Sequence, residues 1–500
     1  MSSFYVKSSR VSKQPEKYCS KMIPQCTLKQ SCLGTIADFL LCWSRNPSRH
    51  SLDMENVKDN PFYNLPIDLR QDMLNSLLNA RPDGKELLHA AELLVSPGIE
   101  SFDLGCIEDC PFPDVKVIMD ILIRHGHSLR ELRVAGHWLY KKESVTLLHR
   151  LLQAAPNLRQ LRLQHTTKTG KEVETIAECC KKLHQLEILH PSLDELDVQA
   201  LAEKIHSNSA CWSMCENLHE IRVPSSANGR TVFLLLQLFP NLEYIHCAYL
   251  EQFLDEMDSA ENQEFWKLRL SKLRGIETTH PLDDDAVSRL VQWCPNLRTV
   301  SLEVQEGMSL RPLTQLPHLQ FLQLRNSPTL PASYIEEVLS LLQSCGQKLL
   351  RLSLEQFDVI DLVKTAYFCP HLRGFSAQWF TVLGSGNVRK NLESFSELRY
   401  LRLRPQVNRK ISAEACQMLL AHCHDLRHLE LYCCYGLNDT LMKKLLSQNS
   451  FKHLRSVVLR HGHGLSADGI NWFIGAAQKL NVCDTGMDPI TRAFEQYHAA

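Results

Sequence analysis

The densest group of potential metal ligands in the sequence is the stretch HCHDLRH at residues 422–428. Its three imidazoles and one thiol are donor types that bind zinc. Cys423, however, stands just ahead of an L-x-x-L pattern, at a place where other segments of the chain also carry a cysteine. We therefore interpret Cys423 as a core residue of a repeating unit and predict no metal ligands.

A second candidate for metal binding is the run of carboxylates at Asp283–Asp285. Clustered carboxylates suit divalent cations such as calcium. The run stands directly before AVSRL, which begins a stretch of helical spacing, and acidic residues there accept hydrogen bonds from the first backbone N–H groups of a helix. We therefore expect Asp283–Asp285 to cap a helix.

Motifs that support catalysis are missing from the sequence. It contains no GxxxxGKS/T, GxSxG, HExxH or paired CxxC motif. The stretch GSGNVRK at 384–390 has glycines but lacks the ending of a phosphate-binding loop. We therefore predict that the protein is not an enzyme, has no catalytic residues and needs no cofactor.

The overall charge gives no reason to expect nucleic acid or a membrane as a partner, since 55 Lys and Arg residues face 56 Asp and Glu residues. The first residues lack the apolar core of a signal peptide, and the longest apolar runs, such as VFLLLQLF, are too short to span a bilayer. The 19 cysteines are odd in number and scattered among apolar positions, which favours reduced, packed thiols. We therefore expect a cytoplasmic or nuclear protein.

One seven-residue pattern, x-L-x-x-L-x-L with other apolar or small residues tolerated at the later sites, recurs along the chain. Clear copies include SLRELRV, NLRQLRL, HLQFLQL, ELRYLRL and DLRHLEL, and weaker copies include GIESFDL and HLRSVVL. About fourteen copies lie between Ile99 and Leu454, with a mean period of about 27 residues. This period is typical of leucine-rich repeats.

Each unit combines a strand pattern with a helix pattern. The L-x-L alternation has the period of a strand with one buried face, and stretches such as VTLLHRLLQAAPNL have helical spacing. Because one such unit cannot bury its own apolar face, neighbouring units must stack. We predict an α/β leucine-rich-repeat solenoid of about fourteen repeats, with a curved parallel sheet inside and helices outside.

The repeats also set the boundaries of the predicted domains. We assign residues 1–24 to a flexible tail, 25–95 to a small all-helical module, 96–480 to the repeat domain and 481–500 to a C-terminal tail. The module at 25–95 is apolar at helical spacing but contains no strand pattern.

The side chains between the core leucines of each strand point to the concave face. Arg and Tyr carry much of the binding energy at protein interfaces, and the last repeats concentrate them, so we expect an acidic or phosphorylated segment of a partner protein there. The alternative is an ordinary solvated polar face. The predicted binding residues are Arg133, Arg162, Arg222, Tyr244, Phe321, Arg325, Tyr400, Arg402, Arg404, Tyr432 and Arg460.

The segment TLKQSCLGTI, residues 27–36, lies before the first repeat. Thr27 is a good helix N-cap, and Leu28, Cys32 and Ile36 follow at i, i+4 and i+8 spacing, on one face of a helix. Such an apolar stripe can cap the first repeat of a solenoid. It can also dock a partner.

The same spacing resembles the elongin-binding box, in which Ser, Thr or Pro precedes Leu, and Cys and an aliphatic residue follow at four-residue steps. Thr27, Leu28, Cys32 and Ile36 fill these positions. The resemblance implies that Leu28 enters a hydrophobic pocket of elongin C. SLLQSCGQKL at 340–349 fits the same pattern inside a repeat, where we expect its Leu and Cys to be core.

A second element, NLPIDLRQDMLNSLL at 64–78, follows the box. Leu65, Pro66 and Leu69 resemble the Leu-Pro helix that contacts the cullin in elongin-binding receptors, and Asp68 stands where the cullin-5 version usually has a second Pro, which favours cullin-2. The order of elongin box, cullin box and repeats resembles that of the zyg-eleven and zer-one type receptors. This resemblance implies elongin B/C and cullin-2 as partners and a protein substrate.

Two alternatives start from the same residues. An F-box also opens with Leu-Pro, and LELYCCYGLNDTLMKKLL at 429–446 resembles the cysteine-containing repeats of F-box receptors. That assignment implies an F-box adaptor and its cullin, although ARPDGKELLHAAELLVSPG lacks the later F-box pattern. The third possibility is a repeat scaffold without any ligase, whose N-terminal helices only cap the solenoid.

Overall fold

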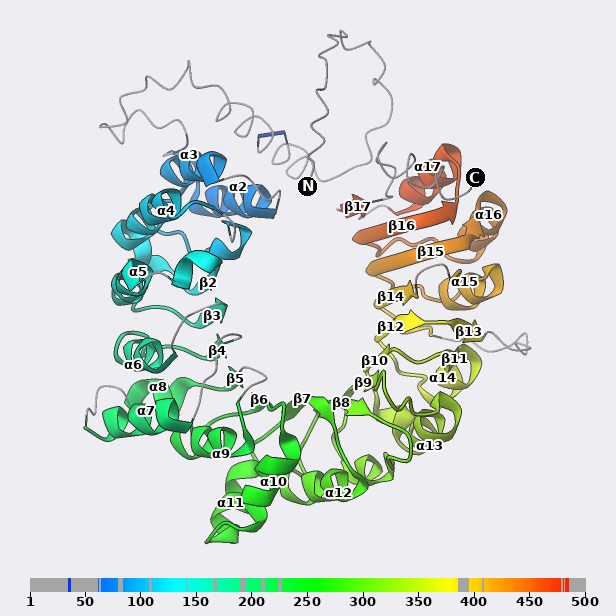
Figure 1. The fold of residues 1–500 in the computed structure, drawn as a ribbon. Coiled ribbons are helices and arrows are strands. Elements are labelled where there is room, and N and C mark those ends of the chain that lie inside the picture. The colour runs from blue at the N-terminus through cyan, green and yellow to red at the C-terminus, as the bar shows by residue number, and fades with distance from the viewer. Residues whose placement is uncertain are drawn as a thin grey trace, which may run out of the picture.

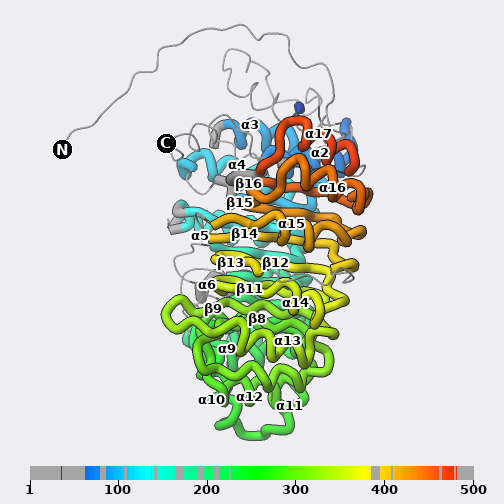
Figure 2. The backbone as a smooth tube through the Cα atoms, turned by 90° about the vertical axis from the view of Figure 1, so that its right-hand side faces the viewer, coloured from blue at the N-terminus to red at the C-terminus, as the bar shows by residue number. Residues whose placement is uncertain are grey.

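The computed structural model describes residues 35–36, 62, 64–79, 84–107, 110–140, 142–164, 169–188, 195–207, 212–223, 227–384, 395–406, 409–477, 480 and 482–484. Within them, one 15-stranded parallel sheet lines the inside of an arc, and helices cover its outside (Figure 1). The fold is therefore a leucine-rich-repeat solenoid, as predicted. The two ends of the arc, at α2–α3 and α16–α17, lie at the top in both views (Figures 1 and 2).

The strands follow one another in chain order across the sheet, while β11 (Val359–Asp361) and β13 (Val382–Gly384) form a separate two-stranded sheet. The strands of the large sheet are β1 (Ser101–Asp103), β2 (Glu131–Ala135), β3 (Gln160–Gln164), β4 (Gln185–Ile188), β5 (Glu220–Arg222), β6 (Tyr244–His246), β7 (Gly275–Pro281), β8 (Thr299–Val304), β9 (Phe321–Asn326), β10 (Arg351–Glu355), β12 (Gly374–Phe380), β14 (Tyr400–Pro405), β15 (His428–Asn438), β16 (Ser456–Gly464) and β17 (Val482–Asp484).

The core leucines of the sequence pattern set the register of this sheet. Leu352 of β10 lies opposite Leu322 of β9 and Phe375 of β12, so equivalent positions of successive repeats form continuous rows. Leu352 and Leu354 are at most 1% exposed, while Ser353 between them points to the concave face. The period-two pattern thus separates a core face from a concave, solvent-facing face.

Helices on the outer side bury the apolar faces that the sequence predicts. The helices are α2 (Ile67–Asn79), α3 (Gly84–Leu94), α4 (Phe112–His125), α5 (Lys142–Ala154), α6 (Thr169–Cys179), α7 (Glu195–Ser207), α8 (Trp212–Asn217), α9 (Gly229–Leu238), α10 (Leu250–Asp258), α11 (Gln263–Leu270), α12 (Asp284–Trp293), α13 (Leu339–Cys345), α14 (Leu362–Phe368), α15 (Ala413–Leu420), α16 (Asp439–Gln448) and α17 (Ala467–Ala476). Short helical turns supplement them at η3 (Leu104–Ile107), η4 (Gly126–Ser128), η5 (His137–Tyr140), η7 (Arg311–Gln315), η8 (Tyr334–Val338) and η9 (Gly346–Lys348).

Asp283 caps α12, as the sequence predicts. Its side chain accepts a hydrogen bond from the backbone N–H of Ala286 at 2.6 Å. Asp285 pairs with Arg289 one turn later, at 2.9 Å. The acidic run therefore caps and stabilises the first turn of α12.

In repeats whose motif begins with Asn-Leu, the asparagine side chain forms a hydrogen bond with the backbone of the preceding repeat. The Nδ2 of Asn157 donates to the backbone oxygen of His127 at 2.7 Å, and Asn296 donates to that of Ser271 at 2.9 Å. Because each bond joins one repeat to the preceding one, these residues help to fix the spacing of the repeats.

The repeat count needs one correction. The fourteen predicted copies coincide with the first fourteen strands of the sheet, and β17 adds a fifteenth inside the segment 481–500 that we assigned to a tail. The pattern misses this copy because Cys483 and Thr485 stand where clear copies have leucine. Backbone pairing of Val457 with Cys483 joins β17 to the sheet.

The N-terminal edge of the sheet is covered by α2 and α3. The Oε1 of Gln71 accepts hydrogen bonds from the N–H groups of Glu100 and Ser101 at 3.0 and 3.1 Å, and its Nε2 donates to the oxygen of Ser101 at 2.9 Å. Met73, Leu74 and other apolar residues of α2 are buried in the same core as the repeats. Helix α2 therefore acts as the cap that an exposed first strand requires.

Among the described helices, none combines the length and the apolar character that crossing a membrane requires.

Candidate partner-binding surface

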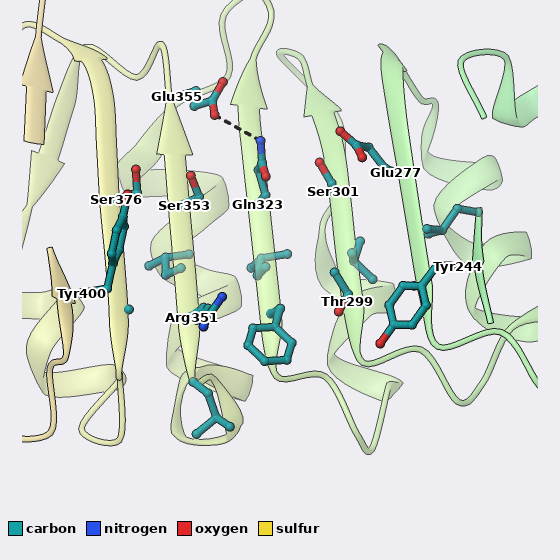
Figure 3. A pocket seen from close by; sticks show the side chains of 18 of the residues that line it. Tyr244, Glu277, Thr299, Ser301, Gln323, Arg351, Ser353, Glu355, Ser376 and Tyr400 are labelled. Carbon is teal, nitrogen blue, oxygen red and sulfur yellow. Dashed lines mark hydrogen bonds between the residues drawn. The ribbon is translucent and has the colours of Figure 1, made fainter. Parts of the chain in front are cut away.

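The concave face contains a cavity of about 1200 Å³ that extends across β5 to β15. Its floor is made of small polar side chains, with Ser301, Gln323, Ser353 and Ser376 on four successive strands (Figure 3). Such a shallow, elongated floor suits an extended surface of a protein better than a small molecule.

Aromatic side chains form a second row across the same cavity. Tyr244, Phe321 and Tyr400 line it from β6, β9 and β14. The ring of Tyr244 lies over Gly275, where an added Cβ would be 2.2 Å from the ring. The glycine thus makes room for a tyrosine that is 37% exposed and available to a partner.

Five of the predicted concave arginines are paired with carboxylates on the same strand or on a strand one or two places away. The solvent-exposed pairs contribute only about 0–1 kcal/mol each to stability, but all five arginines are neutralised. The pairs are Arg133 with Asp103 (3.3 Å), Arg222 with Glu220 (3.1 Å) and Glu277 (3.2 Å), Arg325 with Glu355 (3.2 Å), Arg402 with Glu430 (3.1 Å), and Arg162 with Glu187.

Arg222 illustrates the electrostatics of this row. Burial by itself lowers the pKa of its guanidinium, but Glu277 and Glu220 more than offset that effect, so the pKa is raised. The cation is therefore held firmly charged and is already matched by two anions.

The predicted residues fall into different regions of the concave face. Arg222, Tyr244, Phe321, Tyr400 and Arg402 line the large cavity. Arg133 and Arg162 line a smaller hollow of about 330 Å³ near β2 and β3.

Arg404 belongs to an aromatic stack that the sequence did not predict. Its guanidinium lies 4.4 Å from the ring centroid of Trp379 and 5.5 Å from that of Tyr432. Trp379 has a φ of 60°, and the pairing of β12 with β14 shifts register beside it. A bulky residue with positive φ is an unusual conformation, and here it directs the indole over the arginine.

Arginines at the beginnings of four strands also line the cavity and were not among the predicted residues. Arg351, Arg373, Arg399 and Arg427 line the large cavity from β10 and the residues just ahead of β12, β14 and β15. The recurring HLR, ELR and DLR at the start of the motif are a sequence signal for Arg373, Arg399 and Arg427, whereas Arg351 stands in KLLR, one position later.

The stretch HCHDLRH is divided by the fold. Cys423 is fully buried and its thiol donates to the oxygen of Leu419, while His428 lies 6.4 Å from Tyr400 on the concave side, measured between ring centroids. The described part of the chain brings no three His, Cys, Asp or Glu side chains into a metal-binding group.

The N-terminal box lies mostly outside the described residues. Thr27, Leu28 and Cys32 are among those not described, and Ile36 is partly buried against the repeat core. The second match to the box, at 340–349, is core as expected, since Leu341 and Cys345 are at most 2% exposed.

The Leu-Pro element forms the beginning of α2. Leu65 and Leu69 pack partly against the repeat core, and the oxygen of Pro66 accepts the first hydrogen bonds of the helix. Pro66, Ile67 and Asp68 are exposed, with Ile67 at 42%. The first turn of α2 thus offers a surface, while the remainder of the helix caps the solenoid.

No protein-family model and no curated protein sequence matches the chain. Solved structures with similar folds include Rad7 in its complex with Elc1 from yeast, which is 14% identical over 89% of this chain and 95% of that one, with a TM-score of 0.47. A leucine-rich-repeat protein of Leptospira interrogans is 14% identical over 79% of this chain and 98% of that one, with a TM-score of 0.35. An internalin of Listeria monocytogenes is 14% identical, with coverages of 69% and 79% and a TM-score of 0.30. These likenesses concern the fold alone.

Proposed function

We propose that this protein is a non-catalytic substrate receptor of a cullin-RING ubiquitin ligase. In this function the N-terminal helices dock elongin B/C and cullin-2, and the concave face of the repeats binds the protein to be ubiquitinated. The observation that carries the proposal is the order of Thr27, Leu28, Cys32 and Ile36, then a Leu-Pro helix, then leucine-rich repeats.

The structure of α2 is compatible with this function. A helix that only capped the solenoid would need no exposed apolar residue in its first turn, yet Ile67 is 42% exposed beside the exposed Pro66 and Asp68. One buried leucine or isoleucine side chain contributes roughly 1.5–3 kcal/mol, so a short stripe can anchor a helix if it acts as a hot spot.

Catalysis would come from proximity. A receptor that holds a target protein near the ubiquitin-loaded enzyme raises the effective concentration of the target's lysines, and it needs no reactive side chain of its own. The arc supports this function because it presents a wide concave surface at a distance from the N-terminal docking helices (Figure 1).

The decisive experiment is co-purification of elongin B and C with the full chain and with a Leu28→Ser, Cys32→Ser variant, together with thermal melts of both. We expect the wild type to retain the adaptor and the variant to lose it at an unchanged melting temperature. Leu268→Ser serves as the matched control, because Leu268 is an apolar residue of α11 that is 70% exposed.

Other outcomes would contradict the proposal. If neither protein binds elongin and the double variant melts early, the box is only a cap and the protein is a scaffold. If an F-box adaptor co-purifies instead and is lost on Ile67→Asp, the F-box assignment is correct.

A further inference from the structure

Four arginines form one wall of the concave cavity, and we call Arg351, Arg373, Arg399 and Arg427 the arginine wall. They come from four strands that are neighbours in the sheet, β10, β12, β14 and β15. The N–H of Arg399 donates to the oxygen of Arg373 at 2.8 Å, and the N–H of Arg427 donates to that of Arg399 at 2.8 Å. These bonds hold Arg373, Arg399 and Arg427 at the pitch of the strands, about 4.8 Å, while Arg351 stands one repeat position later, opposite Gly374.

The charges of the arginine wall are poorly compensated within the described part of the chain. Arg399 and Arg427 have no carboxylate within ion-pair distance there, and the Nε of Arg399 is enclosed without a hydrogen-bond partner. The guanidinium of Arg351 lies over the ring of Phe321 at 5.4 Å. Arg373 meets Glu397 at 3.5 Å, but that carboxylate is shared with His371.

This arrangement differs from the neighbouring row of the same face. There, Arg402 and Arg325 each have a carboxylate partner on an adjacent strand. Like charges on adjacent strands repel each other, and Arg399 and Arg427 stand at equivalent positions of adjacent repeats without such partners in the described part of the chain. An anionic ligand would relieve that repulsion.

The shape of the wall indicates the kind of anion. A site for one phosphate converges several donors on one point, whereas these guanidiniums come from separate strands in a line. A line of cations suits a run of single negative charges. The cavity also contains Glu220, Glu277 and Glu355, which would repel the continuous polyanion of a nucleic acid backbone.

Apolar groups lie beside the wall. Phe321 and Tyr400 line the same cavity, and Tyr400 directly follows Arg399 at the start of β14. A protein segment that alternates acidic and apolar residues would therefore find both kinds of contact.

We infer that the arginine wall binds an acidic segment of a partner protein, whose Asp and Glu side chains meet Arg351, Arg373, Arg399 and Arg427 across β10 to β15. The inference rests on the proposed function, because it names the chemistry of the protein that the receptor captures. It places the binding site at the starts of the strands, beside the ion-paired arginines Arg325 and Arg402.

The test uses the full chain and a fluorescent peptide with glutamates at alternate positions and leucines between them. The same peptide with glutamines is the reference. We expect the glutamate peptide to bind about ten-fold more tightly at low salt, an advantage that added salt removes. Arg399→Glu with Arg427→Glu should abolish that advantage.

The matched control is Arg159→Glu with Arg298→Glu. These two exposed arginines stand at the same repeat position on β3 and β8, and the change in net charge is identical. The control should keep the preference for glutamate within about two-fold. Equal binding of both peptides to the wild type, equal loss in both variants, or tighter binding of single-stranded RNA would each overturn the inference.

This result is separable from the proposed function. Arg399→Glu with Arg427→Glu leaves the N-terminal helices unchanged, so elongin should still co-purify with that variant. Loss of glutamate preference with retained elongin supports the inference, whereas a wild type that binds elongin but not the glutamate peptide contradicts the inference alone.

Discussion

Buried cysteine thiols make the protein sensitive to alkaline pH. Burial raises the pKa of the Cys247 and Cys294 thiols from 9.0 to about 12. Burial also raises the pKa of Cys180 to about 12, and the neighbouring Cys179 contributes a smaller increase. In the unfolded chain these thiols ionise near 9, so above that pH the unfolded state binds fewer protons and folding becomes less favourable. Their contribution to stability is complete below pH 9 and is lost as pH rises towards 12.

We therefore expect the urea midpoint to be constant from neutral pH to about 9 and to fall steeply above it. Nine of the twelve described cysteines are buried, so the fall should be steeper than for one thiol. In the double variant Cys247→Ala, Cys294→Ala, the urea midpoint should fall less steeply with pH above pH 9. An equally steep fall in this variant would mean that other groups cause the loss of stability at alkaline pH.

Gly436 and Gly275 both lie against close neighbours, but Gly436 faces backbone and Gly275 faces a side chain of the cavity. A Cβ on Gly436 would lie 2.2 Å from the backbone nitrogen of Ala413, and backbone cannot move aside. A Cβ on Gly275 would meet the ring of Tyr244, which is partly exposed and can swing outward.

We expect Gly436→Ala to lower the free energy of unfolding by roughly 1–3 kcal/mol, and Gly275→Ala by less than about 1 kcal/mol. Gly275→Ala should nevertheless weaken binding at the concave face, because it displaces Tyr244. Chemical denaturation gives the first comparison and a binding assay the second. Similar destabilisation by both changes would mean that the Tyr244 ring is fixed.

At the scale of single elements, α2 owes its position to Gln71 as well as to its apolar face. We expect Gln71→Ala to destabilise the N-terminal end by roughly 1–2 kcal/mol, because the N–H groups of Glu100 and Ser101 and the oxygen of Ser101 lose their partner. Hydrogen exchange should accelerate at Glu100 and Ser101 and not at Thr299 of β8. Gln71→Glu retains the acceptor and should have a smaller effect.

Elements with a strict pattern were predictable from the sequence, and those that depart from it were not. Fourteen strands follow from the alternating pattern, because burial of its two core positions, such as Leu352 and Leu354 of β10, fixes the register of each strand. Between β8 and β9 the 3-10 helix η7 replaces an α-helix, with Pro312 in its first turn. Such local exceptions depend on single residues.

The candidate binding surface was predictable only in part. Strand periodicity placed Arg222, Tyr244 and Arg402 on the concave face correctly. Carboxylate partners of these arginines come from other repeats, such as Glu277 of β7 for Arg222 of β5 at a separation of fifty-odd residues, and periodicity does not reveal pairing. The arginine wall was not predicted, because three of its four members stand just ahead of their strands, where the strand alternation assigns no face.

At the scale of the whole molecule, each repeat contacts its neighbours along one dimension. Leu324 of β9 is fully buried, so Leu324→Ala should cost about 2–5 kcal/mol locally. We expect faster hydrogen exchange in β8 to β10 and little change in β2 and β16. Uniform acceleration along the chain would show that the solenoid unfolds as one cooperative unit.

The backbone bonds that link Arg373, Arg399 and Arg427 give the concave face a fixed pitch, set by the sheet and not by the side chains. We expect such a surface to select a ligand by the spacing and number of its charges as well as by their sign. Duplication or loss of one repeat would add or remove one strand start in this row and leave the spacing of the others unchanged.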